Sequence, residues 1–432
     1  MGNYKVTPTK LKGEVKIPPS KSMAHRAVIC AALGDGISKI RNIDFSDDII
    51  ATVSAMRALG AVITEMDDYL EVKGINYKGI DVVRDYERVV DCNESGSTLR
   101  FLVPIALVFE GVTRFVGRGN LGKRPLTTYY DIFDVQGIKY TYKKDVLDLV
   151  VDGVLKPGEF KVKGNISSQF ITGLLFSLPL LDGDSKIIIT TELESKGYLD
   201  LTLSALKDFG IEIINNDYKE FIIKGNQMYH SKDYTVEGDY SQGAFFLCAD
   251  ALGSEVNVLD LKQDSLQGDS EVIDILRRMG VIFKREGNAI SGKVRKINPT
   301  IIDASQCPDI IPVVSVVAAL AKGIVEVRNA GRLRIKECDR LHAIAEELNK
   351  LGANIEEFED SLVIRGVDSF KGGVEVWSHK DHRIAMMLAI AATACKEPIV
   401  IKDYECVSKS YPGFFEDYKM LGGNINEWHM GK

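Results

Sequence analysis

The chain has 432 residues, a hydrophobic content of 45%, a charged content of 27% and a formal net charge of −7. A single hydrophobic core rarely grows to this size, so we expect two domains. The acidic balance argues against a general nucleic-acid binder, and the longest apolar runs, 170–181 and 384–395, are too short to span a bilayer.

The cysteines and the first residues of the chain indicate the cellular compartment in which we expect the protein. None of the seven cysteines forms a C-x-x-C pair or has histidine neighbours at metal-ligand spacing. We therefore expect reduced thiols and no metal site. The opening M-G-N-Y-K-V-T-P-T-K contains no apolar stretch typical of a secretory signal, so we expect a cytoplasmic protein that does not enter a membrane.

In chain order, the sequence repeats one unit six times. The first landmark of each unit is an amphipathic helical stretch that ends in glycine and is followed by a strand-like run. Glycine at this place suits a left-handed residue that closes a helix. The six glycines recur every 70 to 77 residues: Gly60, Gly137, Gly210, Gly280, Gly352 and Gly422.

The second landmark precedes the first in every unit. It is a polar cluster followed by a mostly apolar run, and the clusters lie at 19–26, 93–100, 164–170, 237–243, 303–309 and 378–383. Each run predicts a buried helix, whereas the amphipathic helix should face solvent on one side. Strands are expected between them, among them 82–90, 160–162, 220–223 and 362–364. Six units in a chain of this length predict two domains of three units each.

The polar clusters at the predicted helix starts contain lysine and arginine as well as capping residues. Serine, asparagine and aspartate at helix starts are explained by capping alone. Lysine and arginine are not, because a cation opposes the dipole at a helix N-terminus. An anionic ligand held by the backbone N–H groups and these cations would reconcile the two. The cations in question are Lys21, Arg26, Arg100 and Arg383.

A further cationic stretch lies between the fifth pair of landmarks. Lys336 and Arg340 are spaced i,i+4, which on a helix is an unfavourable like-charge pair unless an anion binds there. A solvated basic face is the alternative. Asp309 follows Pro308, and taken alone it is more often a helix cap than a site residue.

Together these stretches resemble the signatures of the 5-enolpyruvylshikimate-3-phosphate synthase family over the whole chain. The matching stretches are K-I-P-P-S-K-S-M-A-H-R-A (16–27), S-G-S-T-L-R (95–100), K-R-P-L (123–126), S-S-Q (167–169), S-K-G-Y-L-D (195–200), R-I-K-E-C-D-R-L (334–341), K-D-H-R-I-A-M (380–386) and S-K-S-Y-P-G-F-F (408–415).

The resemblance implies an α/β (α+β) fold of two domains, each of three β-α-β-α-β-β units with buried helices, and a cleft between the domains. It places residues 1–19 with 237–432 in one domain, which carries most phosphoenolpyruvate and acid–base residues. Residues 20–236 form the other and carry most residues for shikimate 3-phosphate. No metal and no cofactor are implied.

The same resemblance implies the site residues. Those for shikimate 3-phosphate are Lys21, Ser22, Arg26, Ser167, Ser168, Gln169, Ser195, Tyr198, Asp309 and Lys336. Those for phosphoenolpyruvate are Lys21, Gly96, Arg124, Gln169, Arg340, Arg383 and Lys409. For proton transfer we expect Glu337 at the methylene carbon, Asp309 at the attacking hydroxyl, Lys21 as a second carrier and His382 as a donor to phosphate or carboxylate.

The expected activity is transfer of the enolpyruvyl group to the 5-hydroxyl of shikimate 3-phosphate by addition and elimination, in aromatic amino acid biosynthesis, by a monomer whose partners are these two small molecules. The alternatives are the enolpyruvyl transferase that acts on uridine-diphosphate-N-acetylglucosamine and a non-catalytic phospholigand-binding repeat protein. Relatives of the former begin with a G-A-K-N-A-like stretch and usually carry a loop cysteine. This chain has P-P-S-K-S and no cysteine between Cys92 and Cys248.

Overall fold

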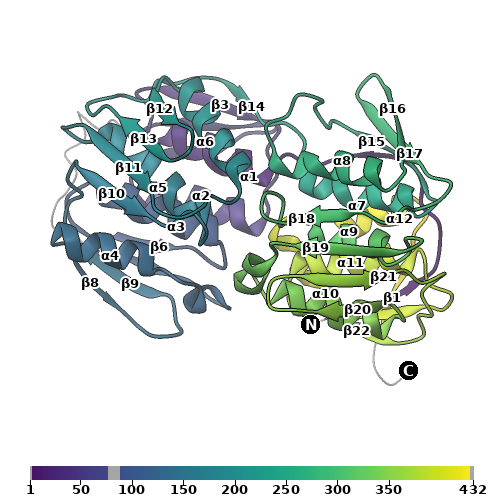
Figure 1. The fold of residues 1–432 in the computed structure, drawn as a ribbon. Coiled ribbons are helices and arrows are strands. Elements are labelled where there is room, and N and C mark those ends of the chain that lie inside the picture. The colour runs from purple at the N-terminus through teal and green to yellow at the C-terminus, as the bar shows by residue number, and fades with distance from the viewer. Residues whose placement is uncertain (1, 76–87, 429–432) are drawn as a thin grey trace. The chain divides into compact units, whose positions relative to one another are not determined.

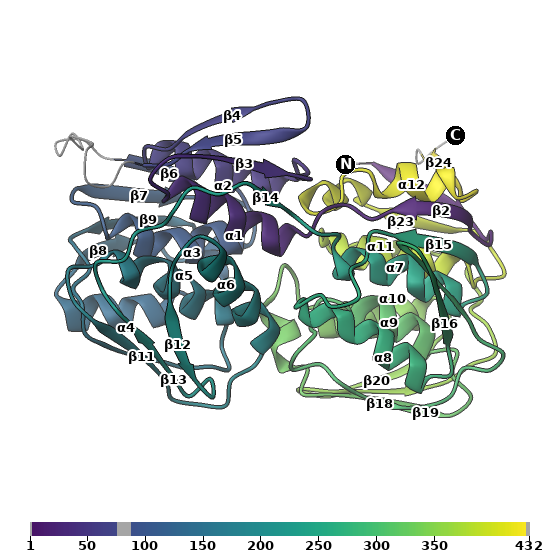
Figure 2. The same cartoon turned by 90° about the horizontal axis from the view of Figure 1, so that it is seen from above.

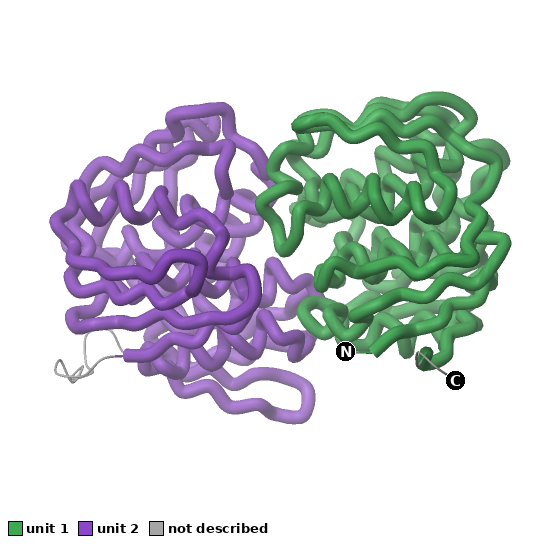
Figure 3. Tube along the Cα trace, turned by 90° about the horizontal axis from the view of Figure 1, so that it is seen from below, with its two compact units in different colours: residues 1–18, 237–432 green, residues 19–236 purple. Residues whose placement is uncertain are grey.

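The structure is a computed structural model that describes residues 2–75 and 88–428. The chain divides into two compact units, coloured separately in Figure 3. Unit 1 is Met1–Pro18 with Glu237–Lys432, and unit 2 is Pro19–Val236. Across the described residues, no helix is long and apolar enough to cross a membrane.

The middle repeat of unit 2 shows the building block most simply. β6 and β7 are parallel, and the hairpin of β8 and β9 adds to β7 antiparallel, giving the sheet order β6-β7-β9-β8. Helix α3 connects β6 to β7, and α4 connects β7 to β8. The elements are β6 (Arg88–Asp91), α3 (Gly96–Ala106), β7 (Val112–Val116), α4 (Thr127–Gln136), β8 (Lys139–Tyr142) and β9 (Asp148–Asp152). This is the predicted β-α-β-α-β-β unit.

Two further repeats have the same order of elements and the same sheet topology (Figure 1). The repeat in unit 2 comprises β10 (Glu159–Val162), α5 (Ser168–Ser177), β11 (Ser185–Ile189), α6 (Lys196–Asp208), β12 (Ile213–Asn216) and β13 (Glu220–Ile223). The repeat in unit 1 comprises β18 (Ile301–Asp303), α9 (Ile311–Ala318), β19 (Ile324–Arg328), α10 (Arg340–Lys350), β20 (Asn354–Glu357) and β21 (Leu362–Arg365).

The remaining three repeats take one strand from a distant part of the chain. The first contains α1 (Lys21–Ala32), β3 (Ile37–Arg41), α2 (Asp47–Ala58), β4 (Val62–Glu65) and β5 (Tyr69–Lys73), and borrows β14 (Tyr234–Thr235). The fourth contains α7 (Tyr240–Ala251), β15 (Glu255–Leu259), α8 (Glu271–Arg278), β16 (Ile282–Glu286) and β17 (Ala289–Lys293), and borrows β2 (Lys12–Lys16).

The sixth repeat borrows the strand nearest the N-terminus. It contains β22 (Glu375–Trp377), α11 (His382–Ala392), β23 (Ile399–Lys402), α12 (Phe414–Met420) and β24 (Asn424–Trp428). β1 (Asn3–Thr7) lies between β23 and β24 and pairs with both, so opposite ends of the sequence share one sheet (Figure 2). Short 3-10 turns complete the described elements: η1 (Leu121–Lys123), η2 (Leu178–Leu180), η3 (Gly268–Ser270), η4 (Gly331–Ile335) and η5 (Tyr404–Lys409).

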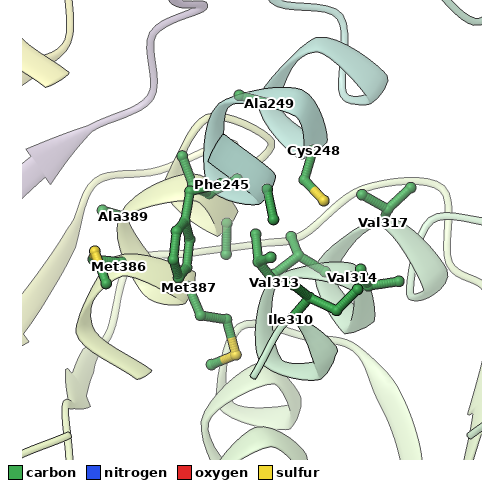
Figure 4. Packing of buried hydrophobic residues seen from close by; sticks show 14 of the residues in the cluster. Phe245, Cys248, Ala249, Ile310, Val313, Val314, Val317, Met386, Met387 and Ala389 are labelled. Carbon is green, nitrogen blue, oxygen red and sulfur yellow. The ribbon is translucent and has the colours of Figure 1, made fainter. Parts of the chain in front are cut away.

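The apolar helices form the centre of each unit, as the sequence predicts. In unit 1, α7, α9 and α11 contact one another, and Phe245, Val313 and Met387 point into their common core (Figure 4). Burying side chains of this size contributes about 1.5–3 kcal/mol each. The amphipathic helices bury one face only: in α8, Val272 is buried while the basic residues of the last turn reach solvent.

The repeat glycines close helices as expected. All six have positive φ, and Gly137 at the end of α4 is left-handed with φ 70°. The strand predictions at 160–162, 220–223 and 362–364 are confirmed by β10, β13 and β21. Of the predicted strand 82–90, residues 88–90 belong to β6, and residues 82–87 lie outside the described residues.

Candidate active site

In unit 2, the first polar cluster starts α1. Ser20 caps the helix by accepting a hydrogen bond from the backbone N–H of Met23 at 3.4 Å. Lys21, the first helical residue, donates from Nζ to Asp48 Oδ2 at 2.8 Å, and both side chains are largely buried. Asp48 is not among the residues predicted from the sequence, although its place in the first turn of α2 is typical of an acidic residue at a helix start.

Arg26 contacts two other predicted residues of unit 2, Ser22 and Tyr198. Its Nη1 donates to the backbone oxygen of Ser22 at 2.5 Å, and its Nη2 donates to that of Tyr198 at 2.8 Å. Its Nε donates to Thr202 Oγ1 at 2.9 Å. Burial lowers the pKa of Arg26 to about 10, so the guanidinium keeps its charge at neutral pH. Arg26 thus ties the start of α1 to the first turn of α6.

The start of α3 forms a second group in unit 2. Gly96 lies against Arg124: a Cβ at this glycine would be 2.5 Å from Arg124 Nη1. Arg100 Nη1 donates to Gln169 Oε1 at 2.7 Å, and Gln169 Nε2 donates to Ser97 Oγ at 2.9 Å. The structure therefore brings the predicted residues Gly96, Arg124 and Gln169 together, and any side chain at position 96 would displace the arginine.

Three of the four predicted serines of unit 2 occupy the starts of two helices that pack on each other, α5 and α6. Ser167 caps α5 by accepting from the backbone N–H of Gln169 at 3.3 Å, and Ser168 follows it. Ser195 precedes α6 with φ 56° and is fully buried. Hydroxyls and N–H groups at helix starts are suited to binding phosphate.

In unit 1, Asp309 is surrounded by cationic side chains. The N-cap position of α9 belongs to the next residue, Ile310, so the interpretation of Asp309 as a helix cap is wrong. Its Oδ1 accepts from Lys336 Nζ at 3.0 Å and from Arg340 Nη1 at 2.8 Å. Arg383 Nη2 lies 3.6 Å from Asp309 Oδ2. The residue before α9 is Ile310, which makes no side-chain cap.

The predicted helical spacing of Lys336 and Arg340 is also wrong. Lys336 has an extended backbone after η4, and α10 begins only at Arg340. The two cations come together because both contact Asp309, which offsets their repulsion. Lys336 and Arg340 are therefore part of a partly buried ion cluster and not of a solvated basic face.

Arg340 is the side chain that organises this cluster. Its Nη2 donates to Glu337 Oε2 at 2.7 Å, and its Nε donates to Asp381 Oδ2 at 2.8 Å. Asp381 also caps α11 by accepting from the backbone N–H of Arg383 at 2.8 Å. Asp381 belongs to the K-D-H-R stretch, but no role was predicted for it from the sequence. Its place one residue before an apolar run was the available signal.

Burial and charge act against each other on Asp309. Burial alone would raise the pKa of its carboxyl, but Lys336, Arg383 and Arg340 outweigh burial and hold that pKa well below its usual range. Burial lowers the pKa of Lys336, with Asp309 acting in the opposite sense. Asp309 is therefore a carboxylate at neutral pH.

His382, Arg383 and Lys409 complete the predicted set in unit 1. His382 and Arg383 are the first two residues of α11 and are buried, and His382 Nδ1 lies 3.8 Å from Asp381 Oδ1. Lys409 is buried at the end of η5, which packs against α11. The next residue, Ser410, accepts from Gln242 Nε2 at 3.4 Å through its backbone oxygen.

One group in the described residues has the composition of a metal site. Ligand atoms of Glu346, Glu347 and His379 lie within 4.8 Å of one another. However, Lys350 Nζ already donates to Glu346 at 2.7 Å and to Glu347 at 2.8 Å. The ammonium balances these carboxylates, and the group has no direct contact with Asp309 or Arg383 among the described interactions. We assign no metal to it.

Comparison with known proteins gives the family. The sequence model of EPSP synthase (3-phosphoshikimate 1-carboxyvinyltransferase) matches residues 6–418. Proteins named 3-phosphoshikimate 1-carboxyvinyltransferase from Clostridioides difficile (strain 630) and Clostridium botulinum (strain Alaska E43 / Type E3) are each 69% identical to this chain, with 100% of both sequences covered.

Solved structures agree in fold. The EPSP synthase from Acinetobacter baumannii has a TM-score of 0.82 at 23% identity, covering 99% of this chain and 100% of its own. The enolpyruvyl transferase NikO from Streptomyces tendae has a TM-score of 0.79 at 18% identity, covering 99% and 98%. At these identities the likeness shows the fold alone. With the family match and the close relatives, the chain belongs to the EPSP synthase (3-phosphoshikimate 1-carboxyvinyltransferase) family.

Proposed function

We propose that this protein is the transferase of its family: it moves the enolpyruvyl group of phosphoenolpyruvate to the 5-hydroxyl of shikimate 3-phosphate and releases phosphate, a step of aromatic amino acid biosynthesis. The single observation that carries the proposal is the partly buried cluster of Asp309, Lys336, Arg340 and Arg383 in a chain of this family.

Both substrates are anions that repel each other, so fixed cations are needed to bind them together. For shikimate 3-phosphate we assign, in unit 2, Lys21, Ser22, Arg26, Ser167, Ser168, Gln169, Ser195 and Tyr198, and in unit 1, Asp309 and Lys336. For phosphoenolpyruvate we assign Lys21, Gly96, Arg124, Gln169, Arg340, Arg383 and Lys409. The arginine forks suit bidentate contacts to carboxylate and phosphate, which lysine cannot make.

The chemistry needs two proton transfers that balance. As the 5-hydroxyl oxygen attacks the central carbon of phosphoenolpyruvate, Asp309 takes the hydroxyl proton and Glu337 gives a proton to the methylene carbon. The resulting methyl group then returns a proton to Glu337 as the bond from carbon to phosphate oxygen breaks. The departing phosphate receives its proton from Lys21 or His382, which Asp309 finally replenishes.

Two features of unit 1 support these assignments. Asp309 is ionised, and anions bound to its cationic partners would raise its pKa toward the operating pH, as a proton acceptor needs. Glu337 and Asp309 both contact Arg340, through Nη2 and Nη1, so the two carboxylates are held on one planar guanidinium at different nitrogens. A fixed separation of the two acid–base groups follows.

The test is phosphate release from phosphoenolpyruvate that depends on shikimate 3-phosphate. The wild-type protein should turn over with both substrates and not with either alone. Glu337→Gln keeps an oxygen for Arg340 but removes the transferable proton, and it should lower kcat by about 10²-fold or more. Glu356→Gln changes an exposed glutamate that also pairs with an arginine, Arg365, and should retain wild-type rates. Equal rates for Glu337→Gln and wild type would refute the role of Glu337.

The same assay separates the alternatives. Turnover with uridine-diphosphate-N-acetylglucosamine in place of shikimate 3-phosphate would favour the other enolpyruvyl transferase. Ligand binding without turnover by the wild-type protein would favour a non-catalytic phospholigand-binding protein.

We also propose that the protein is a cytoplasmic monomer that acts on small molecules and not on nucleic acid, in keeping with the free cysteines and the net charge of −7.

A further inference from the structure

Ser241 has a hydroxyl whose orientation is fixed on both sides. It is a buried residue in the first turn of α7. The cap of that helix, Asp239, accepts from the backbone N–H of Ser241 at 2.8 Å, and its same oxygen, Oδ1, also accepts from the Ser241 hydroxyl. A serine hydroxyl has one proton, so with that proton on Asp239 the oxygen of Ser241 can only accept from other groups.

Arg383 is the group that donates to this oxygen. Its Nη2 donates to Ser241 Oγ at 2.8 Å, and its Nη1 donates to the backbone oxygen of Ser241 at 3.0 Å. One residue thus occupies the far edge of the guanidinium, the edge formed by the two terminal nitrogens. Since the guanidinium is planar and rigid, holding this edge sets the direction of the whole group.

The side edge of Arg383, formed by Nε–H and one N–H of Nη2, is left for a ligand. Nε is buried and has no hydrogen-bond partner among the described residues. The nearby Asp309 Oδ2 is 3.6 Å from Nη2, beyond a hydrogen bond. An unpaired buried donor is unfavourable, and this pair of N–H groups matches the two oxygens of a carboxylate or phosphate.

We propose that Ser241 is a positioning residue for the donor substrate: it locks the far edge of Arg383 so that the side edge points to an anionic group of phosphoenolpyruvate. This rests on the proposed function, which assigns Arg383 to that substrate. Ser241 itself does not touch the reacting atoms in this proposal. It acts through the arginine, with Asp239 fixing its hydroxyl.

The test compares three variants in the phosphate-release assay. Ser241→Ala removes the hydroxyl and should raise the KM for phosphoenolpyruvate about 10-fold or more, as for loss of a hydrogen bond to a charged group. The KM for shikimate 3-phosphate and the melting temperature should stay near wild type. Ser241→Thr keeps the hydroxyl and should restore the KM. Ser315→Ala removes another buried hydroxyl, which donates to the Ile311 oxygen within α9, and should change neither KM.

Each other outcome has a clear meaning. An unchanged KM for phosphoenolpyruvate in Ser241→Ala overturns the inference, as does an equal rise in both KM values with a lower melting temperature, which indicates a merely structural role. If the wild-type protein shows no turnover, the proposed function fails. Calorimetric titration of wild type, Ser241→Ala and Ser315→Ala with phosphoenolpyruvate then tests the positioning role of Ser241 by itself. Weaker binding by Ser241→Ala than by Ser315→Ala supports the inference; equal binding, or none by wild type, overturns it.

Discussion

At the scale of single residues, Arg340 contacts three carboxylates with its three nitrogens, and Nη2 also donates to Asp381 Oδ1 at 3.3 Å. Nη1 meets Asp309, Nη2 meets Glu337 and Nε meets Asp381. Within this buried group the arginine is the common partner, and its carboxylate neighbours raise its pKa against the effect of burial, which lowers it. Removing one partner of a buried ion group leaves charges without compensation, which costs more than the pair itself contributes.

Arg340→Lys should therefore be strongly unfavourable despite keeping the charge. One ammonium cannot reach the positions of three nitrogens, so at least one buried carboxylate loses its partner. We expect the free energy of unfolding to fall by about 3–5 kcal/mol, measured by denaturant titration. The matched control is Arg328→Lys, which changes an exposed arginine paired with Glu326 and should alter stability little. Equal stability of the two variants would contradict the prediction.

At the scale of elements, a buried polar chain links three helices of unit 2. His25 Nδ1 on α1 lies 2.7 Å from Thr52 Oγ1 on α2, and Thr52 Oγ1 lies 2.7 Å from Thr98 Oγ1 on α3. Thr98 donates to the hydroxyl of Ser95, which caps α3. Burial lowers the pKa of His25 to about 3, so the imidazole in the folded protein stays neutral.

This histidine should make unit 2 sensitive to acid. The unfolded chain protonates His25 near pH 6.5, whereas the folded protein does so only near pH 3. Stability from this residue is thus present above pH 6.5 and is lost as the pH falls, at about 1.4 kcal/mol per pH unit. His25→Asn should show a flatter decline in unfolding free energy between pH 6.5 and 4.5 than wild type.

His342 provides a control of opposite sign. It is on α10, and its hydrogen bond with Glu357 raises its pKa. Its contribution is present below pH 6.5 and is lost as the pH rises through the higher folded pKa. His342→Asn should therefore leave the decline between pH 6.5 and 4.5 unchanged and remove a small loss of stability above pH 6.5, small because the exposed pair is screened by solvent. Identical pH slopes for wild type and His25→Asn would show that His25 does not carry the effect.

Helices and strands could be predicted from the sequence better than contacts between residues far apart in the chain. Helix starts and the closing glycines could be predicted because a polar cap, an apolar run and a left-handed glycine are local signals. The place of Lys336 was mispredicted because i,i+4 spacing assumes a helix, and the chain stays extended until Asp339 caps α10. The partnership of Asp309 with two cations from beyond β19 depends on tertiary folding, which no local pattern encodes. Likewise, nothing in Tyr234 and Thr235 predicts pairing with β3.

At the scale of the whole molecule, the chain does not complete each sheet with consecutive residues. β14 completes the first repeat, β2 the fourth and β1 the sixth. β1 is the most demanding case because it is an inner strand: it pairs with β23 on one side and β24 on the other. Its Val6 is fully buried in the core of unit 1. The sixth repeat thus depends on residues nearly 400 positions earlier in the chain.

Deleting residues 1–7 should therefore disrupt the sixth repeat. Without β1, the edges of β23 and β24 lose backbone partners and the core loses Tyr4 and Val6, which is more than a surface truncation would remove. The two tryptophans of the chain, Trp377 on β22 and Trp428 on β24, belong to this sheet and report on it. Acrylamide quenching of their fluorescence should increase in the deletion variant, and its melting temperature should fall.

The add-back control distinguishes strand pairing from a general loss of stability. A synthetic peptide of residues 1–10 can restore the missing strand by adding to the exposed edges, so it should lower quenching toward the wild-type value. The same peptide with Lys5→Pro should not, because proline has no N–H for an inner strand and every N–H of β1 faces a neighbouring strand. A deletion variant that melts like wild type would mean that β23 and β24 need no strand between them.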